Sequence, residues 1–385
     1  MKLLIGADIV PTKSNITEFI HANTTALVDE NLQGVLRNAD YRIFNLEVPL
    51  TDTQRPIEKC GPNLIAPAAS VNGIKALGAD FLTLANNHIM DQDVIGLHNT
   101  IHVLKQKSIK YAGVGDSPEQ AAEPHIFEKD GITVGIYCCA EHEFSIVSDK
   151  KPGANPFDPL WSFDHIQDLK KKCDFVIVLY HGGKEEYRYP SPELQRVCRR
   201  IVDKGADLVI CQHTHCIGCK EKWKQSTIVY GQGNFLFDED DNEYWATSLL
   251  VSVDIQKEDV KIEFIPLCKN GAKVELADEK RKNTILSDFE KRSKEILKDG
   301  IIEEKYNRFA DDMLMSYFNR SLGNIPRSFA FRVLNKISAG KLKGKCYTEN
   351  DLLSLINAIE CEPHRELFIR GLYNCAKKKT SEECK

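Results

Sequence analysis

The chain has 385 residues, with 51 Lys and Arg against 56 Asp and Glu, which gives a formal net charge of -5. One hydrophobic core seldom fills this length, so we expect a large domain together with a smaller one. The mild negative charge and the absence of a long basic block give no support to nucleic-acid binding.

The first residues, MKLLIGADIVPT, contain an apolar run of five residues that ends before Asp8. That run is too short for the core of a signal peptide, and no other apolar stretch is long enough to cross a bilayer. Thirteen cysteines without a secretion signal indicate a reducing compartment and free thiols. The sequence therefore predicts a cytoplasmic protein with no membrane span.

Apolar runs rich in β-branched residues dominate the first part of the chain. They predict strands at 2–7, 41–46, 80–85, 109–112 and 131–140. Helices are expected between them at 14–38, 68–77 and 91–107. The segment 49–67 contains four prolines and is expected to be a loop.

The second part continues this pattern and then changes. Strands are predicted at 174–180, 206–211 and 227–231, and alternating sequences at 246–254 and 259–267 predict an antiparallel pair. From about residue 281 the strand signals disappear, and helical spacing of apolar residues takes over. We therefore predict an α/β domain over residues 1–270 and a helical C-terminal extension over 281–385, with a capping box at Thr348 and Asp351.

Polar side chains follow the predicted strands at the points where the strands end. These residues are Asp8, Glu47, Asn87, His88, Glu141, His142, Glu143, His181, His213 and His215. In open α/β sheets, the loops at the carboxyl ends of parallel strands hold the ligand site. Carboxylates, an amide carbonyl and imidazoles suit Mn²⁺, Zn²⁺ or Fe²⁺, and two such ions can hold both reacting oxygens of a phosphoryl transfer.

Five stretches in order carry a resemblance to a known family: NLEVPLT, LANNHIMD, YHGGKEEYRYPSP, GADLVICQHTH and IVYGQGNFLFD. Their order and spacing resemble the poly-γ-glutamate capsule-biosynthesis (CapA-like) family, which is similar in plan to the calcineurin-like metallophosphatases. The resemblance covers about residues 1–267 and stops at the helical tail. It implies a four-layer α/β/β/α sandwich of the metallophosphatase type.

The resemblance also implies roles for single residues. Asp8 matches the first metal carboxylate, and Glu47 matches the acid that bridges two ions. Asn87 matches an asparagine ligand, and His88 matches a candidate general acid that protonates the leaving group. The remaining imidazole ligands match His181, His213 and His215.

Three departures from the metallophosphatase pattern affect the expected metal sites. Val10 stands where a histidine is usual, Glu47 replaces a bridging aspartate, and residues 211–215 read CQHTH instead of the more common GHHPH. One ion would keep Glu47, Asn87, His181 and His213, whereas the other would have only Asp8, Glu47 and His215. We expect the second site to be weaker, or to be filled only together with substrate.

Other residues permit more than one interpretation. Glu141, His142 and Glu143 either contact substrate, supplement the weaker metal site or form a solvated loop. Arg188 either pairs with a substrate carboxylate or phosphate or lies on the surface. Asn234 is expected to shape a loop at a strand end. Cys216-x-x-Cys219, together with nearby residues, is an alternative structural zinc site, although a second ligand pair is absent.

From these residues and the resemblance we expect a metal-dependent, hydrolase-like protein of the CapA-like family, with chemistry of the metallophosphatase type. The chemistry would be attack by a metal-activated water on a phosphoester or an amide, with one or two divalent ions as cofactors. The resemblance suggests poly-γ-glutamate, or another anionic molecule or polymer, as the partner. The alternative is a non-catalytic polymer-binding or accessory protein that retains a metal pocket, which the missing histidine at Val10 favours.

Overall fold

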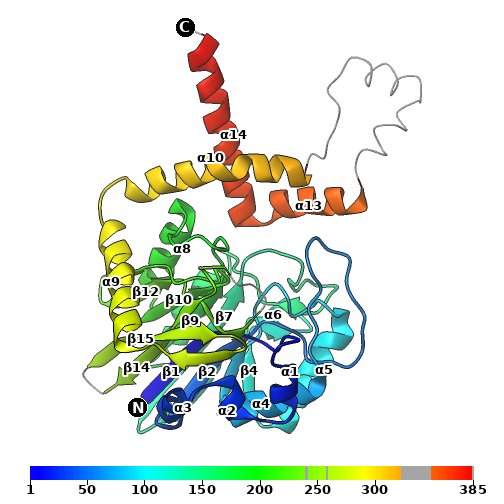
Figure 1. Cartoon of the computed structure of the whole chain (residues 1–385), viewed down its shortest axis with the longest axis vertical. Coiled ribbons are helices and arrows are strands. Elements are labelled where there is room, and N and C mark those ends of the chain that lie inside the picture. The colour runs from blue at the N-terminus through cyan, green and yellow to red at the C-terminus, as the bar shows by residue number, and fades with distance from the viewer. Residues whose placement is uncertain (239–241, 257–258, 322–347, 384–385) are drawn as a thin grey trace. The chain divides into compact units, whose positions relative to one another are not determined.

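The computed structural model describes residues 1–238, 242–256, 259–321 and 348–383. Contacts divide the chain into two compact units. The first comprises Met1–Ile57 and Asn63–Asp299, and the second comprises Glu58–Pro62 and Gly300–Lys385. All strands among the described residues belong to the first unit, whose layers are visible in Figure 1.

The larger sheet of the first unit mixes parallel and antiparallel strands. In hydrogen-bonded order it contains β16 (Lys273–Leu276), β15 (Val260–Asn270), β14 (Thr247–Ile255), β1 (Lys2–Val10), β2 (Tyr41–Leu46), β3 (Phe81–Thr83) and β4 (Lys110–Ala112), and β13 (Asn234–Phe237) pairs with β1. Strands β1 to β4 run parallel to one another. Strands β14 and β15 pair antiparallel, which confirms the prediction from their alternating sequences.

The smaller sheet supplies the other half of the sandwich. Its order is β11 (Lys220–Trp223), β12 (Ser226–Tyr230), β10 (Leu208–Gln212), β9 (Phe175–His181), β7 (Ile132–Ala140) and β6 (His125–Lys129). Strands β7, β9, β10 and β12 are parallel, and β6 and β11 lie antiparallel at the edges. Strands β5 (Val114–Gly115) and β8 (Gly153–Ala154) form a separate two-stranded sheet.

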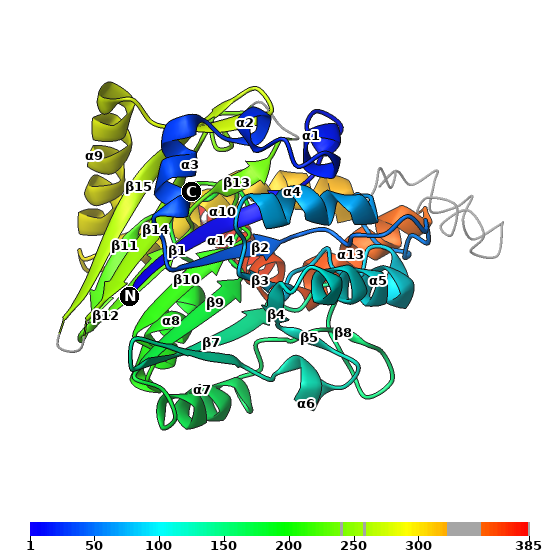
Figure 2. The ribbon, with the colours of Figure 1, turned by 90° about the horizontal axis from the view of Figure 1, so that it is seen from below.

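Helices cover the outer face of each sheet. The larger sheet is covered by α1 (Ile16–Ile20), α2 (Thr24–Leu27), α3 (Glu30–Arg37), η1 (Ala68–Ser70), α4 (Val71–Ala76) and α5 (Asp93–Gln106). The smaller sheet is covered by α7 (Ser162–Lys170) and α8 (Pro192–Asp203), and the short helix α6 (Pro118–Ala121) follows β5. Figure 2 shows α4 and α7 on opposite sides of the sheets. The first unit is therefore a four-layer α/β/β/α sandwich, as predicted.

The segment 14–38, expected to be one helix, is divided into α1, α2 and α3. Ala22, just after α1, has a φ of 56°, which lies outside the helical region. Asp29 then begins α3 as its N-cap and accepts a hydrogen bond from the Leu32 backbone N–H at 3.3 Å. These two local breaks account for the weak apolar period of the segment.

Alternate residues of a central strand serve two different cores. Leu3 and Ile5 of β1 pack between the sheets, in a core shared with Ile177 of β9 and Ile210 of β10. Leu4 faces the other way, into the core beneath the helices. Since successive side chains of a strand point to opposite faces, a strand covered on both sides needs an almost continuous apolar run. The packing of sheet on sheet holds the strand ends that carry the polar residues.

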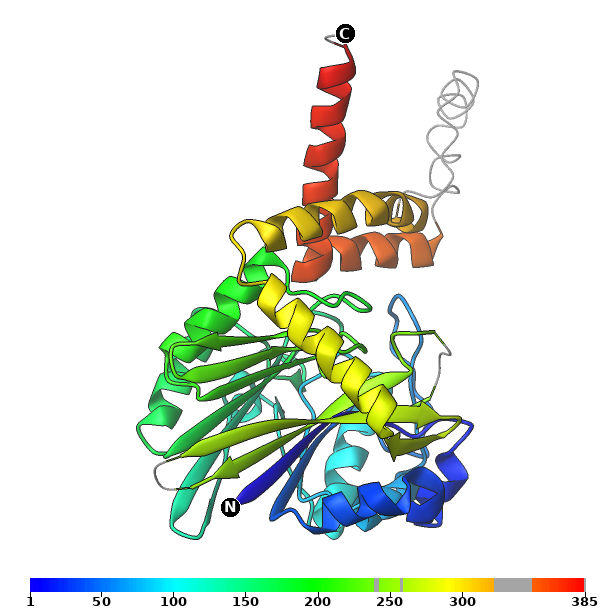
Figure 3. The same ribbon diagram turned by 60° about the vertical axis from the view of Figure 1, so that its left-hand side comes forward.

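Helix α9 (Glu279–Glu295) belongs to the first unit and packs on β15 and β11. It is the yellow helix that crosses the strands in Figure 3. Phe289 is fully buried in a small core with Ile217 and Leu249, and Arg292 Nε donates to the Gly218 carbonyl oxygen at 2.7 Å. The helical part of the sequence thus begins inside the sandwich unit.

The second unit is helical in the part that the structure describes. It contains α10 (Ile301–Ser321), α13 (Glu349–Glu360) and α14 (Glu362–Glu383). The predicted capping box at Thr348 and Asp351 is present at the start of α13. Arg370 of α14 pairs with Glu303 of α10 at 2.6 Å. Over the described ranges, no helix combines the length and the apolar character that a bilayer span needs.

Two helical glycines give a matched test of packing in the helical layer. A Cβ added to Gly73 of α4 would lie 2.5 Å from the Phe19 Cα and 2.8 Å from its carbonyl oxygen, whereas one added to Gly34 of α3 would meet open space. Gly73→Ala should lower the free energy of unfolding by about 1–3 kcal/mol through overpacking. Gly34→Ala should raise it by about 0.5–1 kcal/mol, because Ala is the better helix former. Urea unfolding of both variants checks this, and equal shifts would contradict the close packing of α1 on α4.

Candidate metal centre

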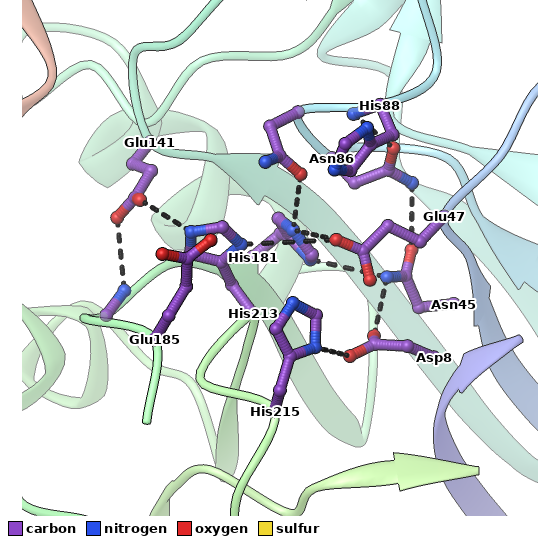
Figure 4. Close-up of polar contacts among 12 residues, drawn as sticks. Asp8, Asn45, Glu47, Asn86, His88, Glu141, His181, Glu185, His213 and His215 are labelled. Atoms are coloured by element: carbon purple, nitrogen blue, oxygen red, sulfur yellow. Dashed lines mark hydrogen bonds and ion pairs between the residues drawn. The ribbon is translucent and has the colours of Figure 1, made fainter. Parts of the chain in front are cut away.

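Strand ends from both sheets bring polar side chains to one place in the first unit (Figure 4). Asp8 lies on β1, Glu47 directly follows β2, and His181 is the last residue of β9. His213 and His215 follow β10. All five side chains are buried. The larger sheet thus supplies the two carboxylates, and the smaller sheet supplies the three imidazoles.

Glu47, His181 and His213 form the first group that could hold an ion. One possible ligand atom from each lies within 4.8 Å of the others. His181 Nε2 is 3.2 Å from Glu47 Oε1, and His213 Nδ1 is 4.0 Å from the same oxygen. Asn87 joins this group, because its Oδ1 lies 3.1 Å from His181 Nε2.

Asp8, Glu47 and His215 form the second group, again with ligand atoms within 4.8 Å of one another. His215 Nδ1 lies 3.4 Å from Asp8 Oδ2 and 2.8 Å from Asn234 Oδ1. Glu47 belongs to both groups. Position 10, where a histidine could extend the second group, holds the apolar Val10, which is buried in the hydrophobic core.

Several buried polar atoms at the centre have no hydrogen-bond partner among the described residues. They are Asp8 Oδ2, Glu47 Oε1 and Oε2, and His213 Nδ1. Removing a carboxylate from water without a partner costs several kcal/mol. Divalent cations at the two groups would give these atoms partners, and mixed carboxylate and imidazole donors suit Mn²⁺, Zn²⁺ or Fe²⁺. The residues therefore fit a divalent metal.

The charges of these groups are strongly coupled. Burial raises the pKa of Asp8, and the neighbouring Glu47 raises it further. Burial also favours a higher pKa for Glu47, but His181 and His215 outweigh it and hold that pKa below its usual range. Burial disfavours the charged form of His215, yet Glu47 and Asp8 raise its pKa to about 10. Burial and His181 lower the pKa of His213, which favours the neutral ring with a lone pair to donate.

Two buried asparagines hold the centre together, and the sequence did not single them out as site residues. Asn45 Nδ2 donates to Asp8 Oδ1 at 2.7 Å and lies 3.3 Å from His181 Nδ1. Asn86 Nδ2 donates to Asn45 Oδ1 at 3.0 Å and to the Leu46 carbonyl oxygen at 2.8 Å. The signal for both was their position inside the NLE and NNH stretches.

Two acidic residues near the centre were also missed. Asp91 is fully buried, and its Oδ2 lies 2.6 Å from His88 Nδ1 and accepts from the Leu64 N–H at 2.6 Å. His88 and Asp91 are three positions apart in the sequence, within the stretch NHIMD. The neighbouring Lys184 holds the pKa of Glu185 well below its usual value. Glu185 thus adds negative charge beside the imidazoles.

Of the other predicted site residues, some lie beside the centre and others make contacts elsewhere. Glu141 is buried beside the centre, with Oε1 3.3 Å from His213 Nε2. His142 and Glu143 follow it in half-buried positions. Arg188 makes contacts elsewhere, because its Nη1 donates to the Ile217 carbonyl oxygen at 3.1 Å and its guanidinium lies 4.7 Å from the Tyr244 ring centre.

The alternative zinc site does not assemble from the described residues. His213 and His215 face the carboxylates of Asp8 and Glu47 instead of the cysteines. Burial raises the pKa of Cys216 to about 11 and that of Cys219 well above its usual value, which disfavours the thiolates that zinc needs. The described metal-capable groups contain neither cysteine.

A comparison with protein families identifies the sandwich. Residues 3–239, more than half of the chain, match the model described as "Bacterial capsule synthesis protein PGA_cap". The chain belongs to this family. The resemblance stated from the five motifs is therefore confirmed at the level of the family.

Two similar proteins have names that match this family. The chain is 29% identical over 234 residues to the capsule biosynthesis protein CapA of Bacillus anthracis, covering 58% of this chain and 57% of that protein. It is 29% identical over 213 residues to the PGA biosynthesis protein CapA of Bacillus subtilis (strain 168), covering 54% and 56%. The chain thus spans somewhat more than half the length of these relatives.

Among solved structures, a novel phosphatase from Mycoplasma pneumoniae is similar, with 16% identity and a TM-score of 0.44. The match covers 70% of this chain and 94% of that protein. Because this score is low, the description of the fold rests on the sheets and helices of the chain itself.

The shared position of Glu47 gives a test with two isosteric variants. Glu47→Gln should lower the affinity for both ions by more than about 100-fold, because it removes the charge common to both groups. This loss exceeds the one typical of residues that only contact a metal ligand. Asp8→Asn should weaken only one ion to that extent. Mn²⁺ titration of the chelated protein measures both effects. Two ions of unchanged affinity in Glu47→Gln would contradict the shared ligand.

Proposed function

We propose that the chain is a metal-dependent hydrolase of the phosphoesterase type, linked to poly-γ-glutamate or another anionic polymer. The observation that carries the proposal is the buried Glu47 carboxylate, which lies between two groups of candidate ligands and has no hydrogen-bond donor on either oxygen. Bound divalent ions would activate a water for attack and offset negative charge on the reacting phosphoryl group.

The first group would bind its ion more tightly than the second. Glu47, His181 and His213 supply one carboxylate and two imidazoles, and Asn87 adds an amide oxygen. The second group would have Asp8, Glu47 and His215 alone. With fewer protein ligands, the second ion would bind more weakly and would gain most from the oxygens of a bound substrate.

His88 would serve as the general acid for the leaving group. Its Nδ1 lies 2.6 Å from the buried Asp91, a contact that orients the ring. In this orientation Nε2 would be the nitrogen that passes a proton to the leaving group. The backbone N–H of His88 also donates to Asn86 Oδ1 at 3.2 Å, which ties the acid to the asparagines behind the ligands.

The link to an anionic polymer comes from the names of the relatives, which describe capsule and PGA biosynthesis. Two divalent ions at this centre would attract carboxylate or phosphate groups. The competing proposal is a non-catalytic, polymer-binding accessory protein. The observation that favours it is the apolar Val10, which leaves the second group with only three candidate ligands.

A leaving-group test addresses the proposed chemistry. With Mn²⁺ present, His88→Ala should lower kcat by about 10²–10⁴-fold on an alkyl phosphoester, because the alkoxide must be protonated as it leaves. The loss should be much smaller on a p-nitrophenyl ester, whose leaving group needs no proton. The exposed His102→Ala is the matched control and should leave both rates unchanged.

The same assays separate the two proposals. Wild-type protein that binds Mn²⁺ but hydrolyses neither phosphoesters nor poly-γ-glutamate would favour the accessory protein. Equal losses on both esters in His88→Ala would contradict the role of this residue as general acid.

A further inference from the structure

Glu141 is fixed on three sides at the edge of the centre. Its backbone N–H donates to the His181 carbonyl oxygen at 3.0 Å. Its carboxylate accepts from the Gly183 N–H at 3.1 Å through Oε2, and Oε1 lies 3.3 Å from His213 Nε2. A Cβ on Gly182 would lie 3.1 Å from Oε2, so the loop after β9 closes tightly over the carboxylate. Glu141 therefore contacts both imidazole-bearing segments of the first group.

The two nitrogens of His213 have different surroundings. Nε2 lies beside Glu141, whereas Nδ1 is buried, has no hydrogen-bond partner among the described residues, and lies 4.0 Å from Glu47 Oε1. A carboxylate beside Nε2 stabilises a proton on that nitrogen. The lone pair is then on Nδ1, on the side of the ring that faces Glu47.

The backbone of His213 has an unfavourable conformation that surrounding contacts must hold. Its φ is 90°, in the left-handed region that side chains other than glycine rarely adopt. A conformation of this kind costs about 1–3 kcal/mol and persists only when surrounding contacts hold it. The contact with Glu141 fixes the ring at the end of this strained segment.

We propose that Glu141 is a positioning residue that orients His213, so that Nδ1 is the ligand atom for the ion of the first group. The proposal rests on the metal centre proposed above and changes the role expected for Glu141 from substrate contact to support of a ligand. Pairs of carboxylate and imidazole at metal sites fix the tautomer of the ring and raise its basicity, and their loss typically costs about 10–100-fold in metal affinity.

Metal binding supplies the first test. Gly183 and His213 lie at different carboxylate oxygens of Glu141. Glutamine at position 141 keeps only one oxygen, so it would face one of these two groups with an NH₂ group, which cannot accept. Glu141→Gln should therefore lower the metal affinity of the first group by about 10–100-fold and change the affinity of the second group by less than about 3-fold. The matched control is Glu128→Gln, which removes one carboxylate from an exposed position on β6 and should change neither affinity. Mn²⁺ titration followed by electron paramagnetic resonance measures both ions.

Ring nitrogen shifts supply a second test that needs no metal. In the chelated wild-type protein, ¹⁵N NMR should show His213 protonated on Nε2 and unprotonated on Nδ1. In Glu141→Gln this preference should weaken, with a measurable population of the other tautomer. A residue with a merely structural role would change the stability of the fold without moving this tautomer.

The outcomes distinguish this proposal from the proposed function. Wild-type protein that binds no Mn²⁺ but has the Nε2–H tautomer, with its loss in Glu141→Gln, would overturn the metal centre and support the orienting contact. Wild-type protein that binds Mn²⁺, together with unchanged affinity in Glu141→Gln, would overturn the role of Glu141 and leave the metal centre standing. An Nδ1–H tautomer of His213 in wild type would also overturn it.

Discussion

The buried carboxylate of Glu47 is the constraint on which the candidate site depends. Neither of its oxygens has a hydrogen-bond donor among the described residues, although the side chain is fully buried. Burial alone disfavours the charged form of this group, and the facing imidazoles of His181 and His215 outweigh that effect and lower its pKa. A protein retains such a group where a cation completes it, and for this reason the arrangement is better explained by chemistry than by folding stability.

The sandwich makes this arrangement possible because neither sheet could form the centre alone. The larger sheet ends in Asp8 and Glu47, and the smaller sheet ends in His181, His213 and His215. The apolar core between the sheets fixes the distance between these two sets of residues. The buried Asn45 and Asn86 then lock the carboxylate side by hydrogen bonds, so the site is held rigid from behind.

Much of this could be predicted from the sequence, because apolar runs place strands and the carboxyl ends of parallel strands lie at one edge of a sheet. That reasoning predicts that Asp8, Glu47, Asn87 and the three imidazoles lie together at one edge. Their roles as ligands stay predictions. The hairpin that contains β6 was missed because its strand is short and partly charged, although Asp130 and Gly131 are typical of a type I′ turn, with φ angles of 56° and 71°.

The contacts of single polar side chains could be predicted less well from the sequence. The sequence pattern says where Arg188 and Glu141 lie along the chain, but not which partner each one selects. Arg188 turns to a backbone carbonyl group and a tyrosine ring, while Glu141 turns inward to His213. Such choices depend on loops that fold back from distant parts of the chain, and local propensity does not encode them. Residues 322–347, part of the predicted helical extension, lie outside the described residues.

The most direct test of the central claim is a crystal structure of the protein grown with Mn²⁺, with the ion located by anomalous scattering. The account predicts an ion bound by Glu47, His181 and His213, and a second one, about 3.5–4 Å away, that shares Glu47. No anomalous signal at Glu47, with its oxygens instead hydrogen-bonded to ordered water, would contradict it.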